Sequence, residues 1–230
     1  MQTSINLFIG WDSRERAAFH ALVESVVTNT KTPVNIRPIC LHQIESIYHR
    51  PISAQSTEFT YSRFLVPYLS GYTGQSIFVD CDFIFTQDIG ELLTYIQPHQ
   101  AVAVVKHNYE SNCAVKFNGQ EQVNYPKKNW SSLMVFNNSL CTALTPALVE
   151  TESGKYLHRF EWLPNEELIG EIPADWNFLV GEYAPAVEAL PRGIHYTLGG
   201  PWFKQFEQCD YNDQFAQYAR LANSAIEKKL

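Results

Sequence analysis

The sequence predicts an α/β protein with a parallel sheet covered by helices. Two observations predict this class. A β-rich run, an amphipathic segment and a second β-rich run lie within about 35 residues of one another, which is the pattern of a βαβ unit. Of the 230 residues, 45% are hydrophobic and 18% are charged, as in a compact globular protein. We therefore expect a single domain over residues 1–230.

The first unit begins with a short buried strand over residues 5–9. After Gly10-Trp11-Asp12 the chain has apolar residues at helical spacing, namely Phe19, Leu22, Val23, Val26 and Val27. A second strand over Val34–Ile39 completes the unit. Because the two strands are joined through a helix, we expect them to be parallel neighbours in one sheet.

The next predicted element is a helix over residues 57–66. Its apolar face carries Tyr61, Phe64 and Leu65, and Pro67 is expected to close or kink it. The remaining elements are strands over residues 76–79, 101–105 and 133–136; a helix capped by Asp88 that runs through Glu91 and Leu92; a long connection over 108–129; and a final amphipathic helix over 212–229 with Phe215, Tyr218, Ala219, Ala222 and Ile226 inward.

Composition and motifs exclude several classes of protein. The formal charge of −7 argues against a general nucleic-acid binder, which would usually display a basic face. The GxGxxG and GxxxxGK[ST] fingerprints are both absent, so dinucleotide oxidoreductases and P-loop NTPases are poor candidates. The five cysteines form no CxxC pair, which predicts neither a zinc cluster nor a disulfide framework. With no signal-like or membrane-spanning run, we expect a cytoplasmic protein.

The pentad Val79-Asp80-Cys81-Asp82-Phe83 is the strongest indication of chemistry. Side chains two apart in an extended segment point the same way, so Asp80 and Asp82 can face one point. Their flanks are apolar, where acids are rare unless they are paired or bind a metal. Surface acids would be the alternative for an isolated DxD. Here the setting favours a Mn²⁺ or Mg²⁺ site, because both ions take oxygen ligands.

Further segments, in order, match one known family. They are Tyr61-Ser62-Arg63, Ile77-Phe78-Val79-Asp80-Cys81-Asp82, Leu133-Met134-Val135-Phe136-Asn137, Trp176-Asn177, and His195-Tyr196-Thr197-Leu198-Gly199-Gly200-Pro201-Trp202. With these motifs over nearly the whole chain, the sequence resembles the retaining family 8 glycosyltransferases. The resemblance implies a GT-A fold, with a mixed, mostly parallel sheet flanked by helices.

The resemblance also implies a donor site for a nucleotide sugar, usually a UDP-sugar. Manganese would be held by Asp80, Asp82 and His195. The alternative for an isolated histidine is a neutral ring that is hydrogen-bonded to a backbone group. Backbone amides of Leu198, Gly199 and Gly200 could approach the pyrophosphate, with a plain turn before Pro201 as the alternative. The acceptor would be the hydroxyl of a carbohydrate or glycolipid.

Three further residues have a family role and a structural alternative. Arg63 would lie at the donor phosphates or sugar, or on a solvated helix face. Lys204 would bind a phosphate, although the family lysine stands immediately before Pro-Trp, where this chain has Gly200. Asp12 would contact the base or ribose, or cap the first helix together with Glu15.

Glu166 and Glu167 occupy the region where the family has a Gln-Asp segment beside the reacting carbon. Either carboxylate could stabilise or attack an oxocarbenium-like centre, or simply begin a helix. Asn129 and Asn137 are candidates for sugar hydroxyls, although Trp130 departs from the family pattern.

Two other functions remain open from the sequence. A metal-dependent nucleotidyltransferase also uses paired acids, but its glycine-rich basic loop is missing. A non-catalytic module that binds sugar nucleotides is compatible with the departures at Gly200 and Glu166.

Overall fold

The computed structural model describes residues 4–51, 55–108, 126–185 and 188–223. The strands are β1 (Ile5–Gly10), β2 (Val34–Ile39), β3 (Gln75–Val79), β4 (Phe83–Phe85), β5 (Val102–Val104), β6 (Leu133–Asn137), β7 (Ile169–Glu171), β8 (Phe178–Leu179) and β9 (Gly193–His195). The α-helices are α1 (Arg16–Asn29), α2 (Val66–Leu69), α3 (Pro146–Thr151), α4 (Gly154–His158) and α5 (Asn212–Asn223).

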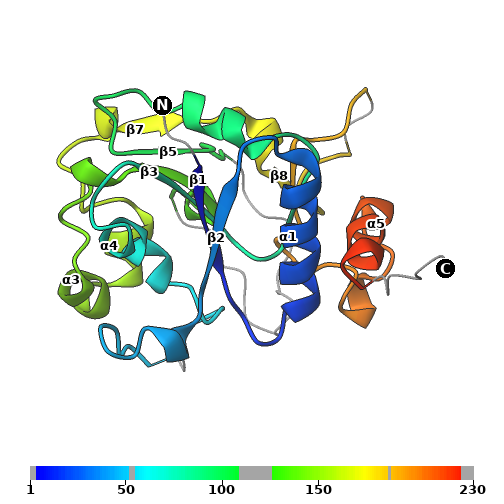
Figure 1. Ribbon diagram of the computed structural model, residues 1–230, viewed down its shortest axis with the longest axis horizontal. Coiled ribbons are helices and arrows are strands. Elements are labelled where there is room, and N and C mark those ends of the chain that lie inside the picture. Colours follow the sequence, from blue (N-terminus) through cyan, green and yellow to red (C-terminus); the bar gives the residue numbers. More distant parts are fainter. Residues whose placement is uncertain (1–3, 52–54, 109–125, 186–187, 224–230) are drawn as a thin grey trace.

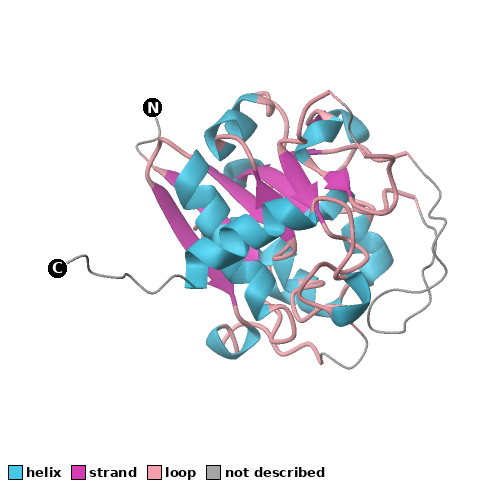
Figure 2. Cartoon of the chain, turned by 90° about the vertical axis from the view of Figure 1, so that its right-hand side faces the viewer, coloured by secondary structure: helices cyan, strands magenta, loops and turns pink. Residues whose placement is uncertain are grey.

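The strands form a large and a small sheet. The large sheet has six strands in the order β2-β1-β3-β6-β5-β7, and the small sheet has three in the order β4-β9-β8. β1 is parallel to both β2 and β3, and β5 is parallel to β7, while β6 is antiparallel to its two neighbours. Helices pack against these strands, as Figure 2 shows. The predicted α/β class, with a mixed and mostly parallel sheet, is confirmed.

The core forms where the strands are apolar on both faces. Ile77, Phe78 and Val79 of β3 are fully buried between β1 and β6, which explains why this strand is a continuous apolar run. A smaller apolar cluster contains Ile194 of β9 and Phe215 of α5. α5 lies beside α1 at one end of the molecule (Figure 1).

The DxD pair lies at the junction of the two sheets. β3 of the large sheet ends at Val79 and β4 of the small sheet begins at Phe83, so only three residues connect them. The amide of Asp80 donates to the carbonyl of Ser132, and the carbonyl of Asp82 accepts from the amide of Tyr196. Because both ends are held by hydrogen bonds to neighbouring segments, the backbone between the acids is fixed.

The first βαβ unit and the capping role of Asp88 are confirmed, since the Asp88 carboxylate accepts from the Gly90 amide at 2.8 Å. Val27 of α1 is exposed, although Phe19, Leu22 and Val26 on the same helix are buried. That helix therefore buries a narrower face than its apolar spacing predicts.

The predicted helix over residues 57–66 is wrong in detail. Residues 58–61 form turns, Ser62–Leu65 is a 3₁₀ helix, and α2 follows it. Pro67 does not close a helix but lies in the first turn of α2, where its missing N–H has no intrahelical partner to lose.

The described part of the last helix differs from the prediction at one side chain. Described α5 ends at Asn223, and Ala222 is exposed rather than inward. The predicted continuation to residue 229, with Ile226, lies outside the described residues, as does most of the predicted connection over 108–129.

Candidate functional site

His195 is brought to the DxD pair by strand register. β4 pairs antiparallel with β9, and Phe83 is directly opposite His195. Asp82 immediately precedes Phe83, so the pairing places the imidazole beside its carboxylate, with Nε2 at 3.4 Å from Oδ1. One ligand atom from each of Asp80, Asp82 and His195 lies within 4.8 Å of the others. This spacing allows one cation to contact all three.

The tautomer of His195 follows from its hydrogen bonds. Its Nδ1 lies 2.8 Å from Oδ1 of Asn177, whose Nδ2 donates to Ser132 Oγ at 2.9 Å and towards the Asn129 carbonyl at 3.4 Å. Since a carbonyl only accepts, the Asn177 amide group must face it, and Oδ1 is left to accept from His195. The neutral ring therefore carries its proton on Nδ1 and directs the Nε2 lone pair towards Asp82.

The chemistry of this group fits a divalent cation. Two carboxylate oxygens and one imidazole nitrogen suit Mn²⁺, which accepts both ligand types, and Mg²⁺ less closely. Phe83 stacks on the His195 ring with centroids 4.2 Å apart, and His195 is buried. The ring is therefore held on one face by packing and at one nitrogen by Asn177, which leaves Nε2 as the ligand atom.

Arg63 is buried against the DxD pair rather than solvated. Its side chain is 6% exposed, and its Nη1 lies 2.7 Å from Oδ1 of Asp80. The same nitrogen donates to the Ser131 carbonyl at 2.9 Å, and Nε donates to the Thr60 carbonyl at 3.1 Å. The alternative of a solvated helix face is excluded by this burial. The segment is a 3₁₀ helix, on which the helical-face argument does not hold.

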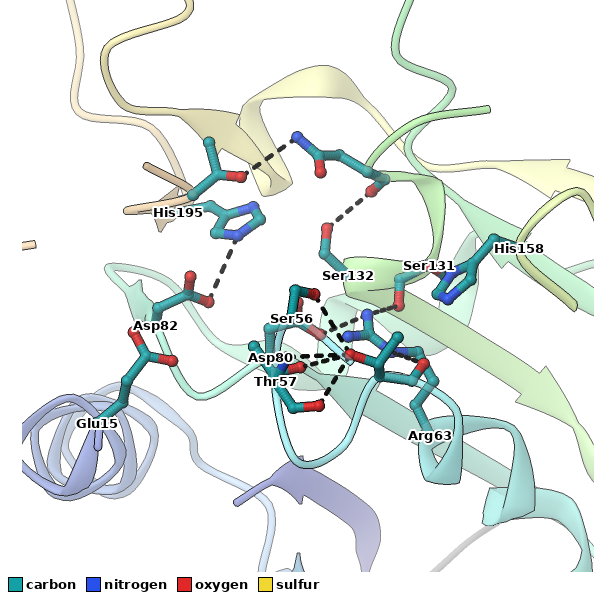
Figure 3. Close-up of a pocket in the computed structure, with 13 residues that line it drawn as sticks. Glu15, Ser56, Thr57, Arg63, Asp80, Asp82, Ser131, Ser132, His158 and His195 are labelled. Carbon is teal, nitrogen blue, oxygen red and sulfur yellow. Dashed lines mark hydrogen bonds and ion pairs between the residues drawn. The ribbon is translucent and has the colours of Figure 1, made fainter. Parts of the chain in front are cut away.

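These groups line one open cleft. Its empty space is about 650 Å³, which includes solvent at the mouth. Figure 3 shows its side chains, and the wall is largely polar. The lining residues are Glu15, Ser56, Thr57, Thr60, Arg63, Asp80, Asp82, Asn129, Ser131, Ser132, His158, His195 and Thr197. Hydroxyl and amide groups of this kind can bind the hydroxyl groups of a sugar.

Glu15 is a cleft residue that sequence reasoning considered only as part of a helix cap. The residue is 2% exposed, and its carboxylate accepts a hydrogen bond from the buried Cys81 thiol at 3.5 Å. Burial, followed by the negative charge of Asp82, raises the pKa of Glu15 to about 9. Its signal in the sequence was its place in the connection between β1 and α1, beyond the carboxyl end of a strand, where open α/β sheets bind ligands.

Ser131 and His158 form a pair in the cleft that the sequence analysis did not identify. The Ser131 hydroxyl lies 2.7 Å from Nδ1 of His158, and the edge of the His158 ring packs against Phe64 with centroids 5.2 Å apart. Both residues line the cleft (Figure 3). The sequence offered no signal for this pair, because the two residues share no motif and lie on different elements.

Asp12 does not line the cleft. Its carboxylate is fully buried and accepts from the amide and Nε of Arg14, at 2.9 and 2.8 Å, and from the amide of Glu58. Burial alone would raise the pKa of Asp12, but the hydrogen bonds from Arg14 outweigh it and lower the pKa. Asp12 makes no side-chain cap of α1, whose N-cap is Glu15. The capping expectation is therefore wrong.

The segment after His195 is a turn. The amide of Gly199 donates to the Tyr196 carbonyl at 2.8 Å, and Gly199 has a φ of 118°, which a residue with a side chain rarely adopts. A Cβ on Gly200 would lie 2.1 Å from the Trp202 ring. Lys204 is exposed at the start of a 3₁₀ helix and does not line the cleft.

Glu166 and Glu167 lie in an exposed 3₁₀ helix, Glu166–Leu168, and neither lines the cleft. The Glu166 side chain is 79% exposed and lies 2.8 Å from the Lys127 ammonium. The hydrogen bond from Lys127 lowers the pKa of Glu166. The Glu167 amide donates to Oδ1 of Asn165, which caps the helix.

Among the described helices, none is both long enough and apolar enough to cross a membrane.

The fold is that of GT-A glycosyltransferases. The chain superposes on WbbM, a bifunctional glycosyltransferase, with a TM-score of 0.66, 17% identity, and coverage of 95% of this chain and 50% of WbbM. For the glycosyltransferase GlyE of Streptococcus pneumoniae TIGR4 the TM-score is 0.64 at 14% identity, covering 95% and 60%. For galactosyltransferase LgtC, solved with donor and acceptor sugar analogs, it is 0.59 at 10% identity, covering 97% and 98%.

The chain thus spans half of WbbM and 60% of GlyE. In sequence it belongs to the family of protein CDI from Arabidopsis thaliana, with 41% identity over 217 residues, which are 90% of this chain and 83% of CDI. No protein-family model matches the chain.

Proposed function

We propose that this protein is a metal-dependent glycosyltransferase of the retaining family 8 type. It moves a sugar from a nucleotide sugar, with a UDP-sugar as the expected donor, to a hydroxyl of a carbohydrate or glycolipid acceptor. The observation that carries the proposal is the group formed by Asp80, Asp82 and His195 at the carboxyl end of β3. The proposal is supported by the position of this group, which lines a polar cleft in a fold shared with glycosyltransferases. We further propose that residues 1–230 act as one domain.

In this proposal Asp80, Asp82 and Nε2 of His195 hold Mn²⁺ or Mg²⁺. The cation would neutralise the negative charge that develops on the departing nucleoside diphosphate. Arg63 keeps the Asp80 carboxylate in place and adds positive charge to the cleft wall. Asn177 holds the His195 proton on Nδ1, so that the other nitrogen remains a ligand.

Hydroxyl-bearing residues would orient the sugar and exclude water from the reacting carbon. Thr57, Thr60 and Ser132 line the cleft with short polar groups that can donate to or accept from sugar hydroxyls. Such groups discriminate between sugars because a missing partner leaves a buried polar atom without a hydrogen bond. The placement of these groups would therefore determine which sugar binds.

Other residues keep roles that rest on the family resemblance. Glu166 and Glu167 are proposed to act at the reacting carbon, and Lys204 is proposed to bind a phosphate. Gly199 and Gly200 are proposed to bring the backbone close to the pyrophosphate. Asp12 is proposed to serve the donor indirectly, since its carboxylate connects Arg14 with Glu58 beside the cleft residues Ser56 and Thr57.

Calorimetric titration of UDP with and without Mn²⁺ tests the proposal. We expect binding to require Mn²⁺ and Asp82→Ala to weaken it by about tenfold or more. Asp213→Ala, which removes an exposed acid on α5, is the matched control and should bind like the wild type.

Two results would contradict the proposal. One is that Asp82→Ala binds UDP with Mn²⁺ as tightly as the wild type. The other is that UDP does not bind in either condition, and pyrophosphate release from a nucleoside triphosphate would then indicate a nucleotidyltransferase. Metal-dependent UDP binding without turnover of any donor would instead indicate a non-catalytic module.

A further inference from the structure

Glu15 is a buried acid whose side chain does not serve the helix that it begins. It occupies the N-cap position of α1 but makes no side-chain capping bond. The residue is 2% exposed, and its side chain turns inward to line the cleft. A glutamate at a helix start normally faces solvent or the first-turn amides, so this orientation calls for a different partner.

The hydrogen bonds of Glu15 leave one carboxyl oxygen without a partner. Oε2 accepts from the thiol of Cys81, the residue between the two acids of the DxD pair. Oε1 is buried and has no hydrogen-bond partner among the described residues. A buried polar atom without a partner costs about 1–3 kcal/mol, which favours a ligand that supplies the missing donor.

The nearby cationic side chains are directed elsewhere. Arg63 contacts Asp80 and two backbone carbonyls, and Arg14 contacts Asp12. No salt bridge in the described part of the chain includes Glu15. Figure 3 shows the Glu15 side chain rising from α1 towards Asp82, on the side of the cleft that also holds His195.

We propose that Glu15 is a positioning residue of the divalent-cation site and accepts a hydrogen bond from a water molecule on the cation. This inference rests on the proposed metal site of Asp80, Asp82 and His195. Glu15 is not among the described residues whose ligand atoms lie within 4.8 Å of one another there, so it acts through water rather than as a direct ligand.

The chemistry of the cation supports this role. Mg²⁺, and Mn²⁺ in similar sites, keeps several water molecules when the protein supplies only a few ligands. Each bound water is a strong donor and needs an acceptor, and partners of this kind typically change metal affinity by about 10- to 100-fold when they are removed. The unpaired Oε1 of Glu15 is an acceptor beside Asp82 for a water molecule of this kind.

The test is the affinity for Mn²⁺ alone, measured by electron paramagnetic resonance of free and bound ion without any nucleotide. Glu15→Gln keeps the shape but replaces one carboxyl oxygen by an amide nitrogen, and Glu15→Met removes the acceptor altogether. We expect the dissociation constant to rise in the order wild type, Gln, Met, by about tenfold in total. Glu24→Gln on the same helix, which does not line the cleft, is the matched control and should bind as the wild type does.

Relaxation of water protons by the bound Mn²⁺ gives a second readout that a purely structural role would not change. We expect Glu15→Met to alter the exchange of metal-bound water, while its unfolding transition remains cooperative. Equal Mn²⁺ affinity of the wild type and both Glu15 variants would overturn the inference and leave the proposed metal site standing. Loss of Mn²⁺ binding in Asp82→Asn with no effect at Glu15 would likewise overturn the inference alone, whereas a wild type that binds no Mn²⁺ would overturn both.

Discussion

Nδ1 of His195 lies 2.8 Å from Oδ1 of Asn177, and this one contact decides which nitrogen of the histidine faces Asp82. The two residues are 18 positions apart in sequence and belong to β9 and to the segment before β8. Asn177 is fully buried and held in turn by Ser132. The geometry of the candidate metal site therefore depends on a residue that is not one of its three candidate ligands.

The first prediction concerns this contact. Asn177→Ala removes the acceptor from His195 Nδ1, so the ring loses its fixed tautomer and orientation. We expect Mn²⁺ affinity to fall by about 10- to 100-fold. Ser132→Ala, which removes one bond to Asn177 but leaves the His195 contact, should have a smaller effect. Equal losses in the two variants would show that the histidine contact has no special role.

The second prediction concerns the ion pair of the buried Arg63 with the half-buried Asp80. Arg63→Met leaves the Asp80 carboxylate, 13% exposed, without the Arg63 guanidinium, and we expect a loss of about 3 kcal/mol in the free energy of unfolding. Chemical denaturation measures this loss. The double variant Arg63→Met/Asp80→Asn should recover part of it, because the Asp80 charge is then gone. If the double variant is as unstable as the single one, packing of the arginine rather than its charge is responsible.

The third prediction follows from the buried His107. Burial, followed by the nearby His195, lowers the pKa of His107 from 6.5 to about 3. Between these values the unfolded chain binds a proton that the folded chain does not, so stability is full above pH 6.5 and falls as the pH drops towards 3. At a pH of about 5 the loss in the free energy of unfolding is about 2 kcal/mol.

The wild type should therefore lose about 2 kcal/mol more unfolding free energy than His107→Asn when the pH is lowered from about 7.5 to about 5. Comparing the two proteins at both pH values cancels the constant effect of losing the 2.8 Å contact between His107 Nδ1 and the Tyr183 hydroxyl. An unchanged difference between the proteins at the two pH values would mean that His107 titrates normally in the folded state.

The fourth prediction concerns Gly193, two residues before His195 on β9. A Cβ at this position would lie 2.0 Å from the carbonyl oxygen of Trp176, which is backbone and cannot turn aside. We expect Gly193→Ala to cost about 1–3 kcal/mol in unfolding free energy. Because β9 must shift, Mn²⁺ affinity should fall as well. Unaltered stability together with unaltered Mn²⁺ affinity would show that β9 accommodates the methyl group without moving the imidazole.

The elements that could be predicted from sequence are those with regular periods. Val34–Ile39 has the predicted bounds, and the helix after β1 buries Phe19, Leu22 and Val26 as their spacing indicates. The segment around Arg63 could not be predicted in the same way. A 3₁₀ helix has a different period, so a residue assigned to the outer face of an α-helix can be buried.

The sequence by itself determined the α/β class, the first βαβ unit and the position of two acids at the end of an apolar strand, because these depend on local periodicity and on the burial of apolar side chains. Only the tertiary structure decided which side chains meet there. It placed His195 beside Asp82 through the pairing of β4 and β9, turned Asp12 away from the cleft and turned Glu15 into it. The reason is that strand pairing and side-chain hydrogen bonds join residues far apart in the chain, and a single sequence does not display such contacts.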